Sequence, residues 1–276
     1  MRPPRDYTIK VLDLGYLLGP ECSISMMVHA MRNTGRARFN IYTYLVEGPG
    51  IPPMIVDTGM KKGQPNAMAQ AGVQWVTTPE NTIERQLAGW GRTREEVKVV
   101  LHTHLHVDHC GNDYQFPHAK IIVARKELMW AAGGIQGGSY PKDLLLYMVE
   151  QAYVPGRMRL LDGDAEIAPG ILCQMCPGHT PGGMIIRVHT KAGEAIICGD
   201  VIYSEQFQVR GWDVIPDIKA QNEWGGGIEA FGDWATGNYV DLAQARWWVQ
   251  KVVREADILL PSHDESVIRK YGSQIG

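Results

Sequence analysis

Histidine and aspartate residues crowd one short segment of this chain. Four histidines and one aspartate fall within positions 102–109, directly after an apolar run rich in β-branched residues. Imidazoles and carboxylates are good ligands for Zn²⁺, and a strand that ends at a turn can bring several of them to one point. The spacing of His104 and His106 suits two ligands to one ion. Asp108 and His109 would then turn toward a second ion.

Three further candidate ligands lie far along the chain, each where an apolar run meets a loop. His179 lies on a Pro/Gly turn, Asp200 follows an apolar run and a glycine, and His263 follows another apolar run. Functional residues are often placed on loops that a rigid scaffold positions. Taken singly, His179 or His263 is better interpreted as an ordinary core or surface residue. The ordered set of seven residues favours a metal site instead.

The segments that would position these residues alternate between predicted strands and helices. Strands are predicted at 9–14, 41–46, 54–56, 97–101, 120–124, 158–161, 171–175, 184–188, 194–197 and 256–260. Helices are predicted from Thr78-Pro79 onward and at 126–132, 142–152 and 241–256. Thr93 and Glu96 have the spacing of a capping box. The pattern favours one domain over 1–276, with helices packed outside two sheets.

Composition and charge exclude several classes of protein. The chain is 45% hydrophobic and 21% charged with a net charge of -3, and it has no long Lys/Arg run that would indicate nucleic-acid binding. No apolar run approaches the roughly eighteen residues that a membrane span requires. The N-terminal residues do not lead into a signal-peptide core. We therefore expect a cytoplasmic protein with no nucleic-acid or membrane partner.

The cysteines and the remaining histidines do not complete a second centre. Cys173 and Cys176 have redox or zinc-knuckle spacing, but no second cysteine pair completes a four-ligand site. We interpret them as buried thiols that pack as small apolar side chains. His102 is interpreted as a packed core residue or as a donor that supports a ligand. No function is predicted for His29, His118 or His189.

The ordered motifs resemble the metallo-β-lactamase superfamily over the range from about Asp57 to His263. The shared features are a His-x-His-x-Asp-His string, a Gly-His turn, a Gly-Asp after a strand and a late histidine. The resemblance implies an α/β (α+β) fold of the four-layer αβ/βα sandwich type, with two Zn²⁺ ions at one edge between the sheets. Iron, manganese or cobalt would suit the same donors. The resemblance to the superfamily also implies that His104, His106 and His179 hold the first ion, that Asp108, His109 and His263 hold the second, and that Asp200 bridges both.

Such a site indicates a hydrolase. Two close divalent ions lower the pKa of a bridging water, and the hydroxide can attack a carbonyl or phosphoryl centre. Asp108 is the candidate to orient the water and carry its proton to the leaving group. Tyr203 lies three positions after Asp200. In the N-acyl homoserine lactonases, which this Asp-x-x-Tyr resembles, the phenol contacts the lactone carbonyl oxygen. The alternative is that Tyr203 only packs in its loop.

Residues 108–120 and 262–264 are similar to lactonases that include 4-pyridoxolactonase. The chain departs from many lactonases at Gly183-Met184, where they have His and Ser, which leaves the subgroup open. We expect hydrolysis of an N-acyl homoserine lactone or a related small lactone. The alternatives are a hydrolase of another ester, thioester or cyclic amide, and a non-catalytic, metal-stabilised binding protein.

The substrate pocket is expected from two stretches rich in aromatic residues, 127–153 and 207–239. Aromatic side chains between glycine kinks suit a mobile lid over an apolar substrate. The alternative is that these residues pack a long loop or form a homodimer contact.

Overall fold

Two β-sheets form the framework in the computed structural model, which describes residues 6–18, 38–64, 73–134, 139–208 and 239–276. The first sheet has the order β13-β1-β2-β3-β5-β6-β7, and β4 pairs with β1. Its strands are β1 (Thr8–Leu18), β2 (Phe39–Glu47), β3 (Met54–Val56), β4 (Gln74–Val76), β5 (Val99–Leu101), β6 (Lys120–Ala124), β7 (Met158–Leu161) and β13 (Gln274–Ile275). The second sheet has the order β12 (Ile258–Pro261), β11 (Gly193–Gly199), β10 (Met184–Thr190), β9 (Ile171–Met175) and β8 (Ala165–Ala168).

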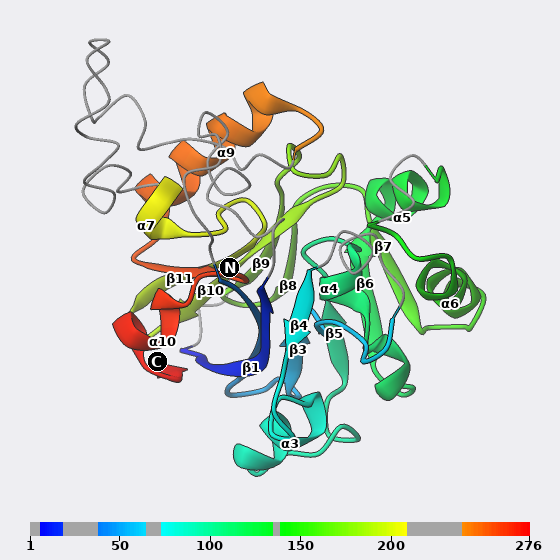
Figure 1. The fold of residues 1–276 in the computed structure, drawn as a ribbon, viewed down its shortest axis with the longest axis horizontal. Helices are drawn as coiled ribbons and strands as arrows, with labels where there is room; N and C mark the ends of the chain where they lie inside the picture. The colour runs from blue at the N-terminus through cyan, green and yellow to red at the C-terminus, as the bar shows by residue number, and fades with distance from the viewer. Residues whose placement is uncertain (1–5, 19–37, 65–72, 135–138, 209–238) are drawn as a thin grey trace.

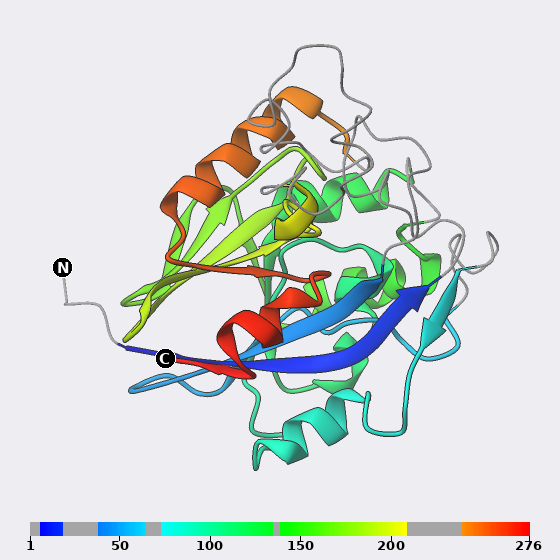
Figure 2. The ribbon, with the colours of Figure 1, turned by 60° about the vertical axis from the view of Figure 1, so that its left-hand side comes forward.

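Helices cover the outer faces of the two sheets. The helical elements are α3 (Ile83–Gly89), α4 (Val107–Cys110), the 3₁₀ turn η1 (Asp113–Gln115), α5 (Arg125–Ala132), α6 (Lys142–Ala152), α7 (Glu205–Gln208), α9 (Leu242–Glu255) and α10 (Ser266–Tyr271). Helices α3, α5 and α6 lie against the first sheet, and α9 lies against the second (Figures 1 and 2). The expected four-layer αβ/βα sandwich is therefore confirmed.

Three apolar clusters hold these layers together. Between the sheets, residues such as Val56 and Leu101 of the first sheet pack with Ile186 and Leu260 of the second. A second cluster joins the first sheet to α3, α5 and α6, and a third joins β10 and β11 to α9. Because burying apolar surface is the main favourable term in folding, these clusters fix the framework that carries the loops.

Several predicted elements have the bounds found in the structure. The strands at 54–56, 120–124, 158–161 and 171–175 and the helix at 142–152 are confirmed. The short elements β4, β8, β13, α7 and α10 were not predicted, because they have too few residues to show a period and lack an apolar run such as the one at 54–56.

The helix predicted from Thr78 was wrong in its start. It begins at Ile83, and its N-cap is Thr82, whose side chain accepts a hydrogen bond from the Arg85 N–H. Thr78 instead bonds to the Asn81 side chain in a turn. The same N-cap chemistry serves turns and helices, so the sequence signal could not separate them.

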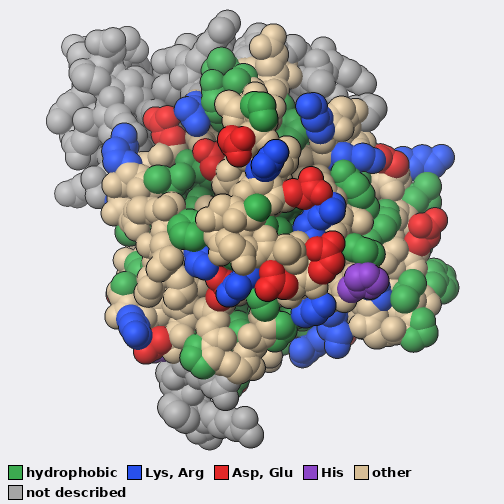
Figure 3. Space-filling model, turned by 90° about the horizontal axis from the view of Figure 1, so that it is seen from below, with side chains coloured by type: hydrophobic (Ala, Val, Ile, Leu, Met, Phe, Trp, Pro, Cys, Tyr) green, Lys and Arg blue, Asp and Glu red, His purple; other side chains and the backbone are tan. Residues whose placement is uncertain are grey.

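Basic and acidic side chains intermingle on the face shown in Figure 3, without a large region of one sign. Among the described residues, no helix is long and apolar enough to cross a membrane.

The strand directions bring the candidate ligands to one edge. Strands β3 and β5 are parallel with Val56 opposite Leu101, so the residues that follow them are neighbours. Strands β11 and β12 are parallel with Gly199 opposite Pro261, which places Asp200 beside the segment that leads to His263. Strand β9 runs with β11 because both are antiparallel to β10. Carboxyl ends of strands from both sheets therefore supply the site.

Gly199, just before Asp200, cannot readily carry a side chain. Its φ is +51°, and an added Cβ would lie 2.7 Å from the Thr103 Oγ1. We expect Gly199→Ala to lower the free energy of unfolding by about 2–5 kcal/mol, because left-handed backbone and overpacking both add cost. Denaturant melts would measure this. Gly91→Ala is the matched control, since its φ is +68° with nothing within 4 Å. Equal losses in the two variants would contradict the role of the Thr103 contact.

Candidate metal centre

Seven buried side chains meet where these strand ends converge. They form one group of His104, His106, His179 and Asp200, and a second group of Asp108, His109 and His263. Within each group the potential ligand atoms lie within 4.8 Å of one another. All seven residues were singled out from the sequence, and the structure brings all of them together.

Asp200 lies between the two groups. Its Oδ2 is 3.2 Å from His179 Nε2 and 3.7 Å from His104 Nε2. Its Oδ1 is 3.0 Å from both His109 Nε2 and His263 Nε2. Each carboxylate oxygen therefore faces a different group of ligands, which is the arrangement a bridging carboxylate needs.

The polar atoms at this point fit bound cations. Within the described part of the chain, His104 Nε2, His109 Nε2 and Asp200 Oδ1 are buried without a hydrogen-bond partner, even though the last two lie 3.0 Å apart. Buried polar atoms are normally satisfied, because leaving one unpaired costs free energy. Imidazole nitrogens and carboxylate oxygens are the donors that Zn²⁺ prefers. The residues present therefore suit divalent ions.

Electrostatics at the centre support the same interpretation. Burial alone would raise the pKa of Asp200, but the imidazoles of His109, His263, His179 and His104 outweigh it and hold that pKa well below its usual range. Burial lowers the pKa of His104 well below its usual value, which favours a neutral ring able to ligate. The charge of Asp200 is thus balanced by neighbouring imidazoles, and metal ions would replace their protons on binding.

Asp57 supports two of the histidines. Its Oδ2 accepts hydrogen bonds from His109 Nδ1 at 2.9 Å and from the Thr103 hydroxyl at 2.7 Å. The Thr103 oxygen lies 3.1 Å from His104 Nδ1, which can therefore donate to it. Both rings then carry their proton on Nδ1 and present the Nε2 lone pair to the ligand groups. Asp57 was interpreted from the sequence only as the end of a strand.

His263 and His102 are held in similar ways. His263 Nδ1 donates to the Asn40 carbonyl oxygen at 2.6 Å, so its Nε2 faces Asp200. The ring of His102 is fully buried, 2.8 Å from Asp113 Oδ2. Burial would lower the pKa of His102, but the carboxylates of Asp113 and Asp57 raise it to about 9. His102 is thus a packed core residue that lies against two buried carboxylates beside the centre.

Tyr203 lies beside both ligand groups. Its buried ring is 4.9 Å from the His263 ring and 6.0 Å from the His179 ring, between centroids. Phe39 packs against its edge at 5.6 Å. The structure therefore brings the predicted catalytic tyrosine to the centre.

Glu127 is a buried supporting residue that the sequence did not reveal. Its Oε1 accepts hydrogen bonds from the Leu105 N–H at 3.0 Å and from the Tyr140 hydroxyl at 2.9 Å. The Tyr140 ring lies 4.7 Å from the His106 ring. Glu127 therefore braces the loop between two candidate ligands.

The two stretches predicted to form the substrate pocket differ in how far the structure describes them. In 127–153, Leu144 and Met148 pack into the core beneath the first sheet, whereas Met129 is 67% exposed. Most of 207–239 lies outside the described residues. The prediction of a substrate pocket there remains a prediction.

The interpretation of Cys173 and Cys176 as buried thiols is confirmed. Cys173 and Cys176 are free and buried. His118 is exposed, and His189 lies 3.4 Å from Asp6 on the surface. Cys22 and His29 lie outside the described residues.

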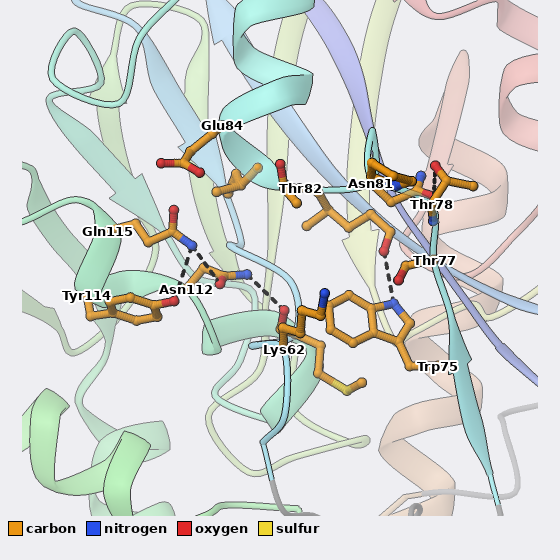
Figure 4. Close-up of a pocket in the computed structure, with 14 residues that line it drawn as sticks. Lys62, Trp75, Thr77, Thr78, Asn81, Thr82, Glu84, Asn112, Tyr114 and Gln115 are labelled. Atoms are coloured by element: carbon orange, nitrogen blue, oxygen red, sulfur yellow. Dashed lines mark hydrogen bonds between the residues drawn. The ribbon is translucent and has the colours of Figure 1, made fainter.

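A separate cleft of about 360 Å³ is lined by residues of β4, of α3 and of the 3₁₀ turn η1, among others (Figure 4). Trp75 and Thr77 lie on one side of it, and Asn112, Tyr114 and Gln115 lie on the other. The Asn112 amide donates to the carbonyl oxygens of Thr58 and Met60 and so fixes the residue that leads into η1. None of the seven candidate ligands lines this cleft. It is therefore distinct from the metal centre.

Residues 36–263 match the family model described as the Metallo-beta-lactamase superfamily. The chain belongs to the metallo-β-lactamase superfamily. The match covers the strands and loops that carry all seven candidate ligands. The family predicted from the ordered motifs is thereby confirmed.

Curated relatives of this superfamily member include N-acyl homoserine lactonases. One from Bacillus sp is 28% identical over 174 residues, which cover 60% of this chain and 65% of the relative. One from Agrobacterium fabrum is 24% identical over 213 residues, which cover 70% of this chain and 76% of the relative. The chain thus spans 65% of the length of the Bacillus relative that it matches.

Solved structures of the superfamily share the fold. An N-acyl homoserine lactone hydrolase with the product N-hexanoyl-L-homoserine at its catalytic metal centre has a TM-score of 0.69 at 20% identity, covering 97% of this chain and 96% of that chain. A probable metal-dependent hydrolase from Staphylococcus aureus has a TM-score of 0.71 at 17% identity, covering 95% and 91%. At these identities the similarity establishes the fold alone.

Removing metal should destabilise the protein. The seven buried candidate ligands are two aspartates and five histidines, and ions that bind only the folded state add stability by mass action. We expect exhaustive chelation to lower the Tm by about 10 °C, and added Zn²⁺ to restore it. Thermal melts with and without chelator would show this. An identical Tm in both conditions would contradict tight metal binding.

Proposed function

We propose that this chain is a dinuclear zinc hydrolase that opens lactone rings, with N-acyl homoserine lactones or related small lactones as substrates. The proposal extends the activity named for the relatives to this chain. Two proteins of similar structure are a quorum-quenching N-acyl homoserine lactone hydrolase and a quorum-quenching N-acyl homoserine lactone lactonase, and we propose the quorum-quenching role for this chain as well.

One observation carries the proposal: Asp200 shares its two oxygens between the two ligand groups, and Tyr203 lies against a histidine of each. In this assignment His104, His106 and His179 would hold one ion, Asp108, His109 and His263 would hold the other, and Asp200 would be a ligand to both. When bound, two divalent ions would activate a water and polarise the substrate carbonyl. A substrate carbonyl bound at this centre would lie near the Tyr203 side chain, because that ring contacts a histidine of each group.

Two side chains would handle protons and charge. The Asp108 carboxylate would take the proton of the attacking water and pass it to the ring oxygen as the ester C–O bond breaks. The Tyr203 hydroxyl would donate a hydrogen bond to the oxyanion that develops on the carbonyl oxygen. The products would be a carboxylate, an alcohol and one released proton.

Product analysis tests the proposed reaction. The zinc-loaded protein would be incubated with N-hexanoyl homoserine lactone, and the product would be identified by mass spectrometry and NMR. The expected product is N-hexanoyl homoserine, which equals the lactone plus one water. Release of hexanoate would show amide cleavage instead, and an unchanged lactone would sink the proposal for this substrate.

Tyr203→Phe should slow lactone opening about ten- to a thousand-fold, in the range for losing one oxyanion donor. The phenylalanine ring would keep the packing against Phe39 and His263, so zinc content and Tm should stay close to the original values. Initial rates at saturating lactone, with metal analysis of the same sample, would measure the effect. An unchanged rate would remove Tyr203 from the mechanism.

The cellular location and the oligomeric state of the protein are also proposals. A small diffusible lactone requires no nucleic-acid or membrane partner, and the intermingled surface charge agrees with that. We place the protein in the cytoplasm and propose a homodimer as its assembly. Cell fractionation and light scattering would test these two points.

A further inference from the structure

Gln208 is a fully buried amide at the end of α7. Its Oε1 accepts hydrogen bonds from the Tyr203 N–H at 2.6 Å and from the Ser204 N–H at 3.1 Å. Its Nε2 lies 3.4 Å from the Val201 carbonyl oxygen and donates to it. One carboxamide thus bonds to three residues of the turn that leads from Asp200 to Tyr203.

The other end of α7 is bonded to the segment that follows β12. The Asp264 Oδ2 accepts a hydrogen bond from the Glu205 N–H at 2.7 Å, and Asp264 directly follows the candidate ligand His263. Lys270 of α10 pairs with the Glu205 carboxylate. Helix α7 therefore connects two parts of the site. Its first residue is bonded to Asp264, next to His263, and its last residue is bonded to the turn that follows Asp200.

We propose that Gln208 is a positioning residue that holds Tyr203 over the centre. The shortest of these hydrogen bonds is the one from the Tyr203 backbone N–H, at 2.6 Å. The Gln208 amide therefore restrains the position of the Tyr203 backbone, from which the phenol side chain extends. Misplacing a catalytic group by about 1 Å can cost roughly a hundred-fold in rate. This inference rests on the proposed lactonase function and assigns a role to a residue that is not one of the seven candidate ligands.

A double-mutant cycle with Tyr203→Phe tests the inference. We expect Gln208→Met, which removes every hydrogen bond of the amide, to lower kcat for lactone opening about ten- to a hundred-fold. In the Tyr203→Phe background the same change should alter kcat by no more than about twofold, because the hydroxyl it positions is already gone. Zinc content should be unchanged in all variants. Gln208→Glu keeps an acceptor for both N–H groups and should retain more activity than Gln208→Met.

A remote glutamine provides the matched control. Gln86 accepts a hydrogen bond from the Asp13 N–H at 2.9 Å and donates to the Glu80 carbonyl oxygen at 3.0 Å, on the outer face of the first sheet. Gln86→Met should leave kcat unchanged. Equal losses from Gln208→Met in both backgrounds, loss of zinc, or Gln208→Glu no better than Gln208→Met would overturn the inference alone. No turnover by the unsubstituted protein would overturn the proposed function and the inference with it.

Discussion

Asp200→Ala is expected to abolish most of the activity and to reduce bound zinc from two ions to at most one. Asp200 Oδ1 and Oδ2 face different ligand groups, so removing the carboxylate takes one ligand from each proposed ion. It also leaves buried imidazoles without the charge that balances them. Because metal ions contribute several kcal/mol of transition-state stabilisation, we expect kcat to fall about a thousand-fold or more.

The measurement is kcat together with zinc content by elemental analysis on the same folded sample. Asp162→Ala is the control, because it removes an exposed carboxylate that pairs with Arg125. That variant should keep both ions and full activity. An Asp200→Ala protein that still bound two ions tightly would contradict the bridging role.

Asp108→Asn is the second large effect that we expect. The amide oxygen can still act as a ligand beside His109 and His263, so the fold and much of the metal should be retained. The amide cannot take a proton from water or carry it to the leaving oxygen. General acid–base catalysis contributes about a hundred- to ten-thousand-fold, and we expect kcat to fall within that range.

Circular dichroism, zinc analysis and initial rates on the Asp108→Asn protein would check this. Retained fold and metal with lost turnover would separate an enzyme from a metal-stabilised binding protein. Full activity would contradict the proposed proton transfer.

The site could be predicted from the sequence more completely than the fold around it. His104, His106, Asp108 and His109 stand in one short string, and each distant ligand follows an apolar strand. Few residue types bind Zn²⁺ well, so the order and spacing of these residues indicated the set, and the resemblance to the metallo-β-lactamase superfamily assigned each of them to an ion. The longer strands and helices were predictable as well, because each has enough residues to show its period.

The supporting residues could not be predicted in the same way. Gln208 and Glu127 act largely through hydrogen bonds to backbone groups, which many polar residues can make anywhere in a chain. Asp57 gave the same signal as Asp200, an aspartate after an apolar strand, yet only the pairing of β3 with β5 reveals its contact with His109. Short elements such as α7 depend on tertiary contacts rather than on local pattern.

Proton release by the purified, zinc-loaded protein tests the central claim most directly. A pH indicator would follow a panel of acyl homoserine lactones of several chain lengths, 4-pyridoxolactone, simple γ- and δ-lactones, a thioester and a β-lactam. We expect turnover confined to lactones, lost on chelation and restored by Zn²⁺. Silence on every lactone with turnover of another panel member would contradict the proposed reaction and the role of Tyr203.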